Sequence, residues 1–373
     1  MKNKNILFVG EWLSANLGDQ VLCSCVYEIV QRFIPTANLM KFDSSFGNGF
    51  SLKKRIGLLP HRVYYKINKN IDKRTENFNN IKRNWTISDL QNIKESIDLI
   101  IICGGQMFLD YFADNLKCIC DYANKKSIPI FWNSVGGGKC SERTISIFKE
   151  CIHSNSSKLL TIRDNLDFFR EILKVNAHLV PDPAIFSSQY FPANSVKQKT
   201  VGLGIMNPSA FKDFKVAPQR IRQFWIDVIS QLENRKISWE LFTNGSSEDA
   251  DFLSTLLPLI KVKNIRIAAV PLNGLDLINL VTKYSKIISF RLHSHIIAYS
   301  YKVPSFGIIW DNKVLDFFDF VGNSNNYMFI KDLNISKVTD FVEKGNSNFS
   351  QLEYLQNDVK NSIIDNINRI IHI

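Results

Sequence analysis

Short apolar runs alternate with helical patterns along most of the chain, and most of the runs end in glycine or polar residues. In the first half, the predicted strands are residues 4–10, 38–42, 98–103, 128–135, 158–163 and 178–181. The predicted helices are residues 18–33, 87–96, 107–123, 141–153 and 166–175. Continuous apolar strands that each feed a helix are typical of a parallel sheet covered on both faces. The first half is therefore predicted to be a doubly wound α/β domain.

The alternation weakens over residues 189–199 and then restarts. The second set of predicted strands is residues 200–206, 237–243, 266–270, 286–290 and 305–309, with helices at residues 218–234, 248–259, 275–284 and from His293 onward. Residues 351–371 keep their apolar positions on one helical stripe. We predict a Rossmann-like domain at residues 1–190, a second one at residues 191–350 and a C-terminal helix at residues 351–373. Two doubly wound domains facing a cleft is the simplest architecture.

Residues 43–85 have no clear period and are predicted to be an insertion with one or two short helices. The formal net charge is +11, and residues 51–85 contribute ten Lys or Arg against two acidic residues, so +8 lies here and about +3 elsewhere. A nearly neutral protein with one basic segment argues for a local basic patch and against a nucleic-acid groove.

Composition limits the cellular setting. The chain has no apolar run of ~18 residues that would span a membrane. Its first apolar run is shorter than the ~7–15 residues of a signal peptide, so we expect a cytoplasmic protein. The seven cysteines are scattered, and the two Cys-x-Cys pairs are spaced more tightly than zinc ligands. Reduced thiols and no metal site are expected.

The densest group of chemically capable side chains lies between residues 286 and 313. Arg291, His293 and His295 follow one predicted strand, and Asp311 and Lys313 follow the next. In an open α/β sheet, ligands bind beyond the carboxyl ends of the strands. A guanidinium, two imidazoles, a carboxylate and an ammonium are therefore expected at one edge of the second sheet.

Glycine-rich corners follow three predicted strands of the first domain. Gly18 allows close approach to an anion at a helix N-terminus, although Asp19 beside it also suits a simple helix cap. The other two corners are either turn chemistry or parts of a ligand-facing edge. No dinucleotide fingerprint or Walker A motif is present, which argues against a classical dinucleotide or ATP site. The corner residues of interest are Asn16, Gly18, Asp19, Gly104, Gly105, Gln106, Asp110 and Asn133.

Further polar residues leave other predicted strands. Arg163 and Asp164 end one strand, where they form either a local ion pair or a forked anion site. Asn207 and Asn244 each follow a strand of the second domain. These positions lie on the same kind of strand-end edge as Arg291.

Taken in order, these pieces resemble the polysaccharide pyruvyl transferase family. The matching stretches run from about Phe8 to Gly322 and are NLGDQ, CGGQMFLD, IRDNLDF, VPDPAIF, TNGSSED and RLHSHIIAYSYKVPSFGIIWDNK. Two positions depart from the family pattern. Gln106 stands where a third glycine is usual, and Leu166 stands where a serine often follows the Arg-Asp pair.

The resemblance implies a two-domain fold similar to GT-B glycosyltransferases and transfer of a pyruvyl group from phosphoenolpyruvate to a sugar as a cyclic ketal. It places catalytic residues at His293 and Lys313, and donor-binding arginines at Arg291 and, less directly, Arg163. We add Asn207 to the donor side. The expected cleft and acceptor residues are Asn16, Gly18, Asp19, Gly104, Gly105, Gln106, Asp110, Asn133, Asn244 and His295. Phosphoenolpyruvate is a co-substrate, and no cofactor or metal is expected.

Two other readings stay open at this stage. One is a GT-B-type glycosyltransferase that uses a nucleotide sugar, and the other is a non-catalytic glycan-binding or scaffold protein. Acceptors in this family are often lipid-linked. The basic, aromatic-containing segment from Lys53 to Trp85 is therefore either a peripheral contact with the anionic inner face of the membrane or a solvated insertion.

Overall fold

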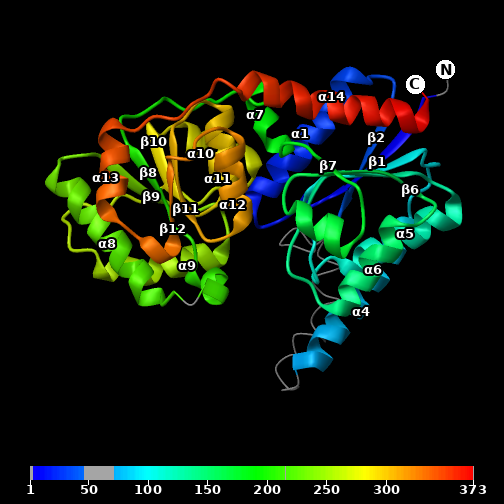
Figure 1. Ribbon diagram of the computed structural model, residues 1–373, viewed down its shortest axis with the longest axis horizontal. Helices are drawn as coiled ribbons and strands as arrows, with labels where there is room; N and C mark the ends of the chain where they lie inside the picture. Colours follow the sequence, from blue (N-terminus) through cyan, green and yellow to red (C-terminus); the bar gives the residue numbers. More distant parts are fainter. Residues whose placement is uncertain (1–2, 46–70, 215, 373) are drawn as a thin grey trace. The chain divides into compact units, whose positions relative to one another are not determined.

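The computed structural model describes residues 3–45, 71–214 and 216–372, which form two compact units (Figure 1). Unit 1 comprises Met1–Ser14, Val26–Pro181 and Lys360–Ile373. Unit 2 comprises Ala15–Cys25 and Asp182–Val359. The units divide after Pro181, whereas the sequence analysis placed the division at residue 190. The first and last long helices, α1 (Leu17–Phe33) and α14 (Leu352–Ile371), each contribute residues to both units.

Unit 1 is built on a parallel sheet in the order β2-β1-β3-β5-β6-β7, with β4 paired to β5. Its strands are β1 (Asn5–Gly10), β2 (Asn38–Asp43), β3 (Leu99–Ile102), β4 (Gly105–Phe108), β5 (Ile130–Gly137), β6 (Ser157–Ile162) and β7 (His178–Leu179). The helices that connect them are α4 (Ile71–Gln91), α5 (Ala113–Lys126), α6 (Glu142–Ile152) and the π-helix η1 (Phe168–Ile172). Strand β3 is buried along its whole length, as expected of a strand covered on both faces.

Unit 2 has a parallel sheet in the order β12-β11-β10-β8-β9. Its strands are β8 (Val201–Gly204), β9 (Trp239–Phe242), β10 (Lys286–Ser289), β11 (Ser305–Ile309) and β12 (Tyr327–Phe329). Its longer helices are α8 (Pro218–Asn234), α9 (Ser247–Leu256), α10 (Gly274–Thr282), α11 (Leu292–Ser300), α12 (Asn312–Phe320) and α13 (Ile335–Lys344). Short segments complete it: η2 (Pro183–Phe186), α7 (Ser187–Tyr190), η3 (Pro208–Phe214), η4 (Leu257–Leu259) and η5 (Ile330–Asp332). The prediction of two Rossmann-like α/β domains is confirmed.

Aromatic side chains fill the core of each unit. In unit 1, the ring of Phe108 packs against Phe148 and Trp132, with centroid distances of 4.6 and 5.4 Å. In unit 2, Phe290 at the end of β10 stacks on Phe211 at 4.9 Å. Because Phe290 immediately precedes Arg291, this packing fixes the backbone from which the polar residues at the sheet edge project.

The structure corrects several predicted elements. Residues 266–270 were expected to be a strand, but they form only an isolated bridge between Ile267 and Leu241. Met107 was placed in a helix and lies in β4, where the polar Gln106 interrupts the apolar pattern. Helix α4 covers residues 71–85, which showed no clear period because they are mostly polar, and it continues into the helix predicted at residues 87–96, ending at Gln91. The sequence analysis did not predict α12, β12 or α13.

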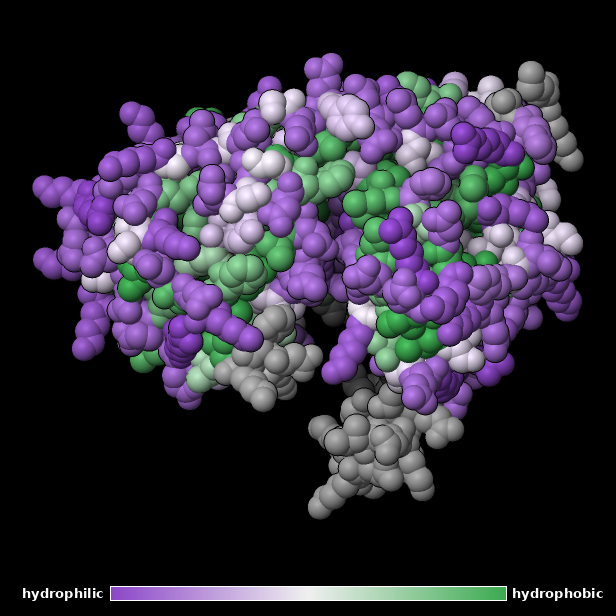
Figure 2. All heavy atoms as spheres, in the orientation of Figure 1, coloured by the Kyte–Doolittle hydropathy of each residue, from purple (hydrophilic) through white to green (hydrophobic). Residues whose placement is uncertain are grey.

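Hydrophilic residues dominate the face drawn in Figure 2, with hydrophobic residues gathered in patches between them. Over the parts of the chain that the structure describes, no helix is both long enough and apolar enough to cross a membrane.

Candidate active site

The carboxyl edge of the unit 2 sheet carries the predicted cluster. Strands β10 and β11 are hydrogen-bonded neighbours, so their carboxyl ends lie side by side. Arg291 is the N-cap of α11, and His293 lies in the first turn of that helix. Asp311 is the N-cap of α12, with Lys313 just inside the helix. Two strand ends therefore deliver these four side chains to one edge.

His293 lies between two carboxylates of unit 2. Its Nε2 atom is 3.6 Å from Oδ2 of Asp182 and 3.8 Å from Oδ1 of Asp19. All three side chains are almost completely buried, with His293 only 5% exposed. Nε2 has no hydrogen-bond partner, and buried polar atoms are rarely left without one. A buried imidazole nitrogen flanked by carboxylates is a strong candidate for proton transfer.

Local bonds orient each carboxylate. Asp182 precedes η2 and accepts a hydrogen bond through Oδ1 from the backbone N–H of Ala184 (2.8 Å). Asp19 accepts one through Oδ2 from the side-chain amide of Asn16 (2.5 Å). In both residues the other oxygen is the one near His293. These two side chains are therefore held by their own turns with one oxygen aimed at the imidazole.

The close packing of His293 requires a glycine at position 18. A Cβ atom built on Gly18 would overlap the imidazole of His293. The glycine at the start of α1 therefore lets the histidine ring pack against the backbone. The sequence analysis placed Asn16, Gly18 and Asp19 in the first domain, but residues 15–25 group with unit 2, where Gly18 and Asp19 lie beside His293.

Arg291 is anchored by a fully buried acid. Its Nε and Nη2 atoms both donate to Oδ2 of Asp249, at 3.0 and 2.6 Å. The other oxygen of Asp249 accepts the backbone N–H of Asn207 (2.9 Å). Asp249 is 0% exposed, whereas the side chain of Arg291 is 22% exposed. Because a guanidinium carries five N–H donors, Arg291 can bind an anion while it stays fixed by Asp249.

Asn207 and Lys313 are partly committed to local bonds. The side chain of Asn207 donates to the carbonyl of Glu248 and accepts the N–H of Ser209. The Nζ atom of Lys313 lies 3.3 Å from Oδ2 of Asp311 and 5.0 Å from the ring centre of Trp310. The side chain of Lys313 is 16% exposed, so its charge remains within reach of a ligand at this edge.

His295 and Asn244, which were predicted to contact the acceptor, are both buried. His295 is fully buried, contacts the ring of Phe318 edge-on, and pairs through Nε2 with the carbonyl of Ser289 (3.0 Å). Burial lowers the pKa of His295 to about 4, against the opposing effect of that hydrogen bond. Asn244 accepts a hydrogen bond from the hydroxyl of Ser294 (2.8 Å). Both positions favour packing beneath the site over contact with an acceptor.

The glycine corners of unit 1 surround a second buried polar cluster. The Nε atom of Arg163 lies 3.1 Å from Oδ2 of Asp164, and both side chains are 4% exposed. Asp164 also accepts the N–H of Gly137 (3.2 Å). A Cβ on Gly136 would meet the Asp164 carboxylate at 2.7 Å. This glycine corner therefore makes room for the Arg163–Asp164 ion pair. Of the two roles predicted for these residues, a local ion pair or a forked anion site, the structure shows the ion pair.

The remaining unit 1 candidates hold corners and caps. Gly104 and Gly105 have φ angles of 110° and 85°, which side-chain-bearing residues rarely adopt. Asn133 is fully buried and donates to the carbonyl of Cys103, with its Oδ1 atom unpaired. Asp110 accepts the N–H and the hydroxyl of Ser141, the N-cap of α6. Gln106 is half-buried in β4.

Two site residues were missed by sequence reasoning. Asp182 lies in the VPDPAIF stretch, and Asp249 lies in TNGSSED. Neither acid was among the predicted site residues. Both acids could have been found because each lies in a stretch that resembles the family, a few residues after a predicted strand.

The basic insertion is only partly visible. Residues 53–70 lie outside the described part of the chain, so the proposed membrane contact from Lys53 to Trp85 has no structural account here. Lys82, counted in the basic patch, is instead buried in unit 1. Its Nζ donates to the carbonyl of Tyr111 (2.9 Å) and lies 3.3 Å from the centre of that ring. Burial lowers the pKa of Lys82 to about 7, although Asp114 opposes the shift.

Solved structures with a similar fold show the fold class. UDP-GlcNAc 2-epimerase from Methanocaldococcus jannaschii aligns with a TM-score of 0.59 at 12% identity, covering 98% of this chain and 99% of that one. The MnaA–UDP co-structure from S. aureus gives 0.60 at 10%, covering 100% and 97%. The UDP-GlcNAc-bound epimerase from Neisseria meningitidis gives 0.55 at 10%, covering 99% and 100%. At these identities the likeness concerns the fold, which is of the GT-B type.

The family follows from the sequence itself. The model of the polysaccharide pyruvyl transferase family matches residues 16–312, a range that includes Asp19, Asp182, Arg291 and His293. The protein therefore belongs to the polysaccharide pyruvyl transferase family, and the resemblance drawn from the motifs is confirmed. A comparison with curated proteins finds no significant match.

Proposed function

We propose that the protein transfers a pyruvyl group from phosphoenolpyruvate to two hydroxyls of a saccharide, as a cyclic ketal, during synthesis of a capsular, extracellular or cell-wall polysaccharide. The observation that carries the proposal is the buried His293 with its unpartnered Nε2 atom beside two carboxylates. Family membership supports a transferase acting on polysaccharide precursors.

The reaction needs a place for two anionic groups. Phosphoenolpyruvate carries a carboxylate and a phosphate, and both suit a cationic edge. Arg291 offers fixed N–H donors because Asp249 holds its guanidinium. Lys313 provides a point charge on the neighbouring strand end, suited to the departing phosphate. We assign the donor to this edge, with Asn207 supporting the arginine through Asp249.

The proposed chemistry balances without a further reactant. A first sugar hydroxyl gives up its proton and bonds to C2 of phosphoenolpyruvate, while C3 gains a proton and becomes a methyl group. The C2–O bond to phosphate then breaks, and the phosphate leaves with the electron pair. A second hydroxyl bonds to C2 and gives up its proton, so the products are the ketal and inorganic phosphate. His293 is the group proposed to move these protons.

Asp182 and Asp19 have a supporting part in the proposal. Two carboxylates place negative charge near Nε2, the atom proposed to carry the proton in transfer. They also keep the ring in one orientation, because rotation would move Nε2 away from both. We describe Asp182 and Asp19 as positioning residues, since neither is argued to contact the reacting atoms.

The test is to incubate the protein with phosphoenolpyruvate and candidate glycans and to follow phosphate release. The proposal predicts release that depends on both substrates and that falls by roughly 10²- to 10⁴-fold in His293→Gln, the range for general acid–base catalysis. Hydrolysis of a nucleotide sugar with no phosphate release from phosphoenolpyruvate would favour a glycosyltransferase instead. Unchanged complementation by the histidine variant would favour a glycan-binding scaffold.

A further inference from the structure

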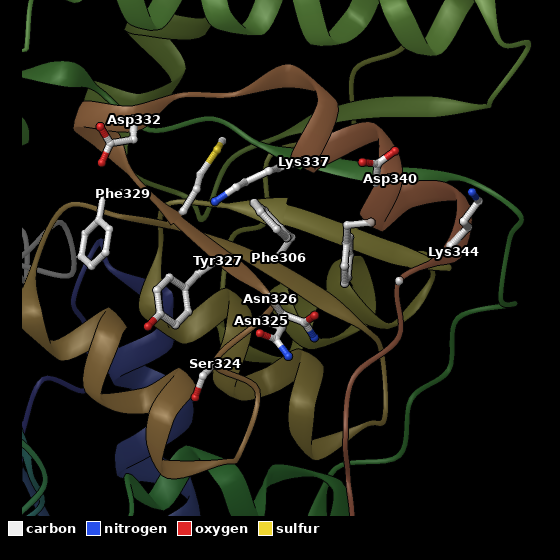
Figure 3. Close-up of a pocket in the computed structure, with 13 residues that line it drawn as sticks. Phe306, Ser324, Asn325, Asn326, Tyr327, Phe329, Asp332, Lys337, Asp340 and Lys344 are labelled. Atoms are coloured by element: carbon white, nitrogen blue, oxygen red, sulfur yellow. The ribbon is translucent and has the colours of Figure 1, made fainter.

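A pocket of about 610 Å³ lies in unit 2 between β12 and α13 (Figure 3). Its apolar residues include Phe306, Met328 and Phe341, each at most 5% exposed. The rings of Phe306 and Phe341 pack with their centroids 5.3 Å apart. The volume falls in the range of small-ligand sites in proteins. The pocket therefore has a rigid base formed by core residues.

Two aromatic rings stand along one side of this pocket. Figure 3 shows the side chains of Tyr327 and Phe329 near one another among the residues that line the pocket. Their centroids are 5.8 Å apart, with the planes at 80°. Phe329 is 45% exposed, which leaves much of a large apolar ring in water. Exposed aromatic rings that border a pocket offer flat apolar surface at low conformational cost.

Polar side chains without internal partners complete the lining. Ser324 and Asn325 come from the loop before β12, Asp332 is the last residue of η5, and Lys337 reaches in from α13 (Figure 3). Within the described part of the chain, none of these four side chains makes a hydrogen bond or ion pair. Their donors and acceptors are therefore available to a ligand.

The charges of the lining indicate the ligand class. Lys337 and Lys344 are balanced by Asp332 and Asp340. A balanced pocket does not select phosphate-rich ligands, which require an excess of cations. A β-strand of a partner is also disfavoured, because β12 has only three residues to pair with. Aromatic faces with mixed amide, hydroxyl, carboxylate and ammonium groups match the apolar C–H faces and hydroxyls of a saccharide.

The end of the pocket at Phe329 lies toward the candidate active site within the same unit, whereas Ser324 and Asn325, which precede β12, line its opposite end. Phe329 ends β12 and is paired with Ile309 at the end of β11. Lys313 follows that strand end, and β11 is the neighbour of β10, which leads to Arg291. Adjacent strands are about 4.8 Å apart, so the end of β12 is roughly 10 Å from the end of β10. A short glycan can span such a distance.

We propose that this pocket is a second saccharide-binding site, which holds sugar residues of the acceptor chain away from the one that reacts. The proposal rests on the proposed function for its choice of acceptor. Its binding surface is independent of phosphoenolpyruvate. The enzyme would thereby bind an oligosaccharide more tightly than the matching monosaccharide.

The test is binding of the full-length protein to an array of immobilised mono- and oligosaccharides, followed by titration of any sugar that binds. The proposal predicts that Phe329→Ala and Asn325→Ala each weaken oligosaccharide binding by about tenfold, the effect of losing roughly 1.4 kcal/mol. Tyr354→Ala is the matched control, because Tyr354 is a 71% exposed aromatic residue of unit 2 outside the pocket. Its binding should equal that of the wild type.

The outcomes separate this proposal from the proposed function. Wild-type protein that binds no glycan on the array, or Phe329→Ala protein that binds as tightly as the wild type, overturns the second site. A melting curve checks that each variant is folded, and the exposed position of Asn325 makes its variant the safer one. If binding depends on Phe329 but no phosphate is released from phosphoenolpyruvate, the second site stands and the pyruvyl transfer falls.

Discussion

The Nε2 atom of His293 lies 3.6 Å from Oδ2 of Asp182, although 111 positions separate the two residues in the chain (293 − 182 = 111). Asp182 is the first residue of the second segment of unit 2, directly after the chain leaves the unit 1 sheet. Both residues belong to the same segment of unit 2, Asp182–Val359, so the pair forms by folding within that segment, whereas Asp19 comes from the other one. The proposed role of Asp182 is to orient the imidazole of His293.

Replacing Asp182 by Asn tests this role. We expect kcat for pyruvyl transfer to fall by roughly 10- to 100-fold, with KM for phosphoenolpyruvate little changed, because the charge beside His293 is lost while the shape is kept. Steady-state kinetics measures the split. In a double variant with His293→Gln, the second change should add little, since the two residues act as a unit. Additive losses would show that Asp182 acts separately from His293.

The anchored arginine gives a second prediction. Arg291→Lys keeps the charge but loses the fork that Asp249 holds, so KM for phosphoenolpyruvate should rise by about tenfold or more, corresponding to one charged hydrogen bond. Arg266→Lys is the control, because Arg266 is a partly exposed arginine of unit 2 that pairs with Glu233. An unchanged KM in Arg291→Lys would remove Arg291 from the donor site.

His295 makes stability depend on pH. Its pKa is lowered by burial to about 4, so the unfolded chain binds a proton more readily than the folded one. This contribution to stability is complete above about pH 6.5 and is lost as the pH falls toward 4, by roughly 3 kcal/mol. His295→Gln should lose that part of the pH dependence. Denaturant unfolding of both proteins between pH 4 and 7 measures it, and parallel curves would contradict the assignment.

Lys82 also makes the stability of the fold depend on pH, in the alkaline range. Burial lowers its pKa to about 7, so raising the pH from 7 to about 10.5 should remove a cost of up to roughly 4 kcal/mol from the folded state. Lys82→Met should lack this dependence and be most favourable, relative to wild type, at neutral pH. Lys117→Met is the control, because Lys117 pairs with Asp121 near the surface. Equal pH profiles for wild type and Lys82→Met would show that Lys82 is solvated.

The sequence predicted the site best where chemically reactive side chains directly follow strands with a clear apolar pattern. Arg291, His293 and Lys313 could be placed at one edge because buried parallel strands such as β10 and β11 have a plain apolar signal. Asp182 was not recognised as a site residue, since its proposed role depends on its contact with His293, which is distant in the sequence. Lys82 was misread as surface charge, because its burial against Tyr111 depends on tertiary packing of a polar helix. The short strand β12 has too few residues to show a period.

The central claim is tested most directly with phosphoenolpyruvate labelled with carbon-13 at C2, a saccharide acceptor and the wild-type protein. The account predicts that the label moves into a ketal carbon of the saccharide, seen by NMR, in step with release of inorganic phosphate, and that His293→Gln shows neither. Label that stays in phosphoenolpyruvate, while the same protein transfers sugar from a nucleotide sugar to the acceptor, would contradict it.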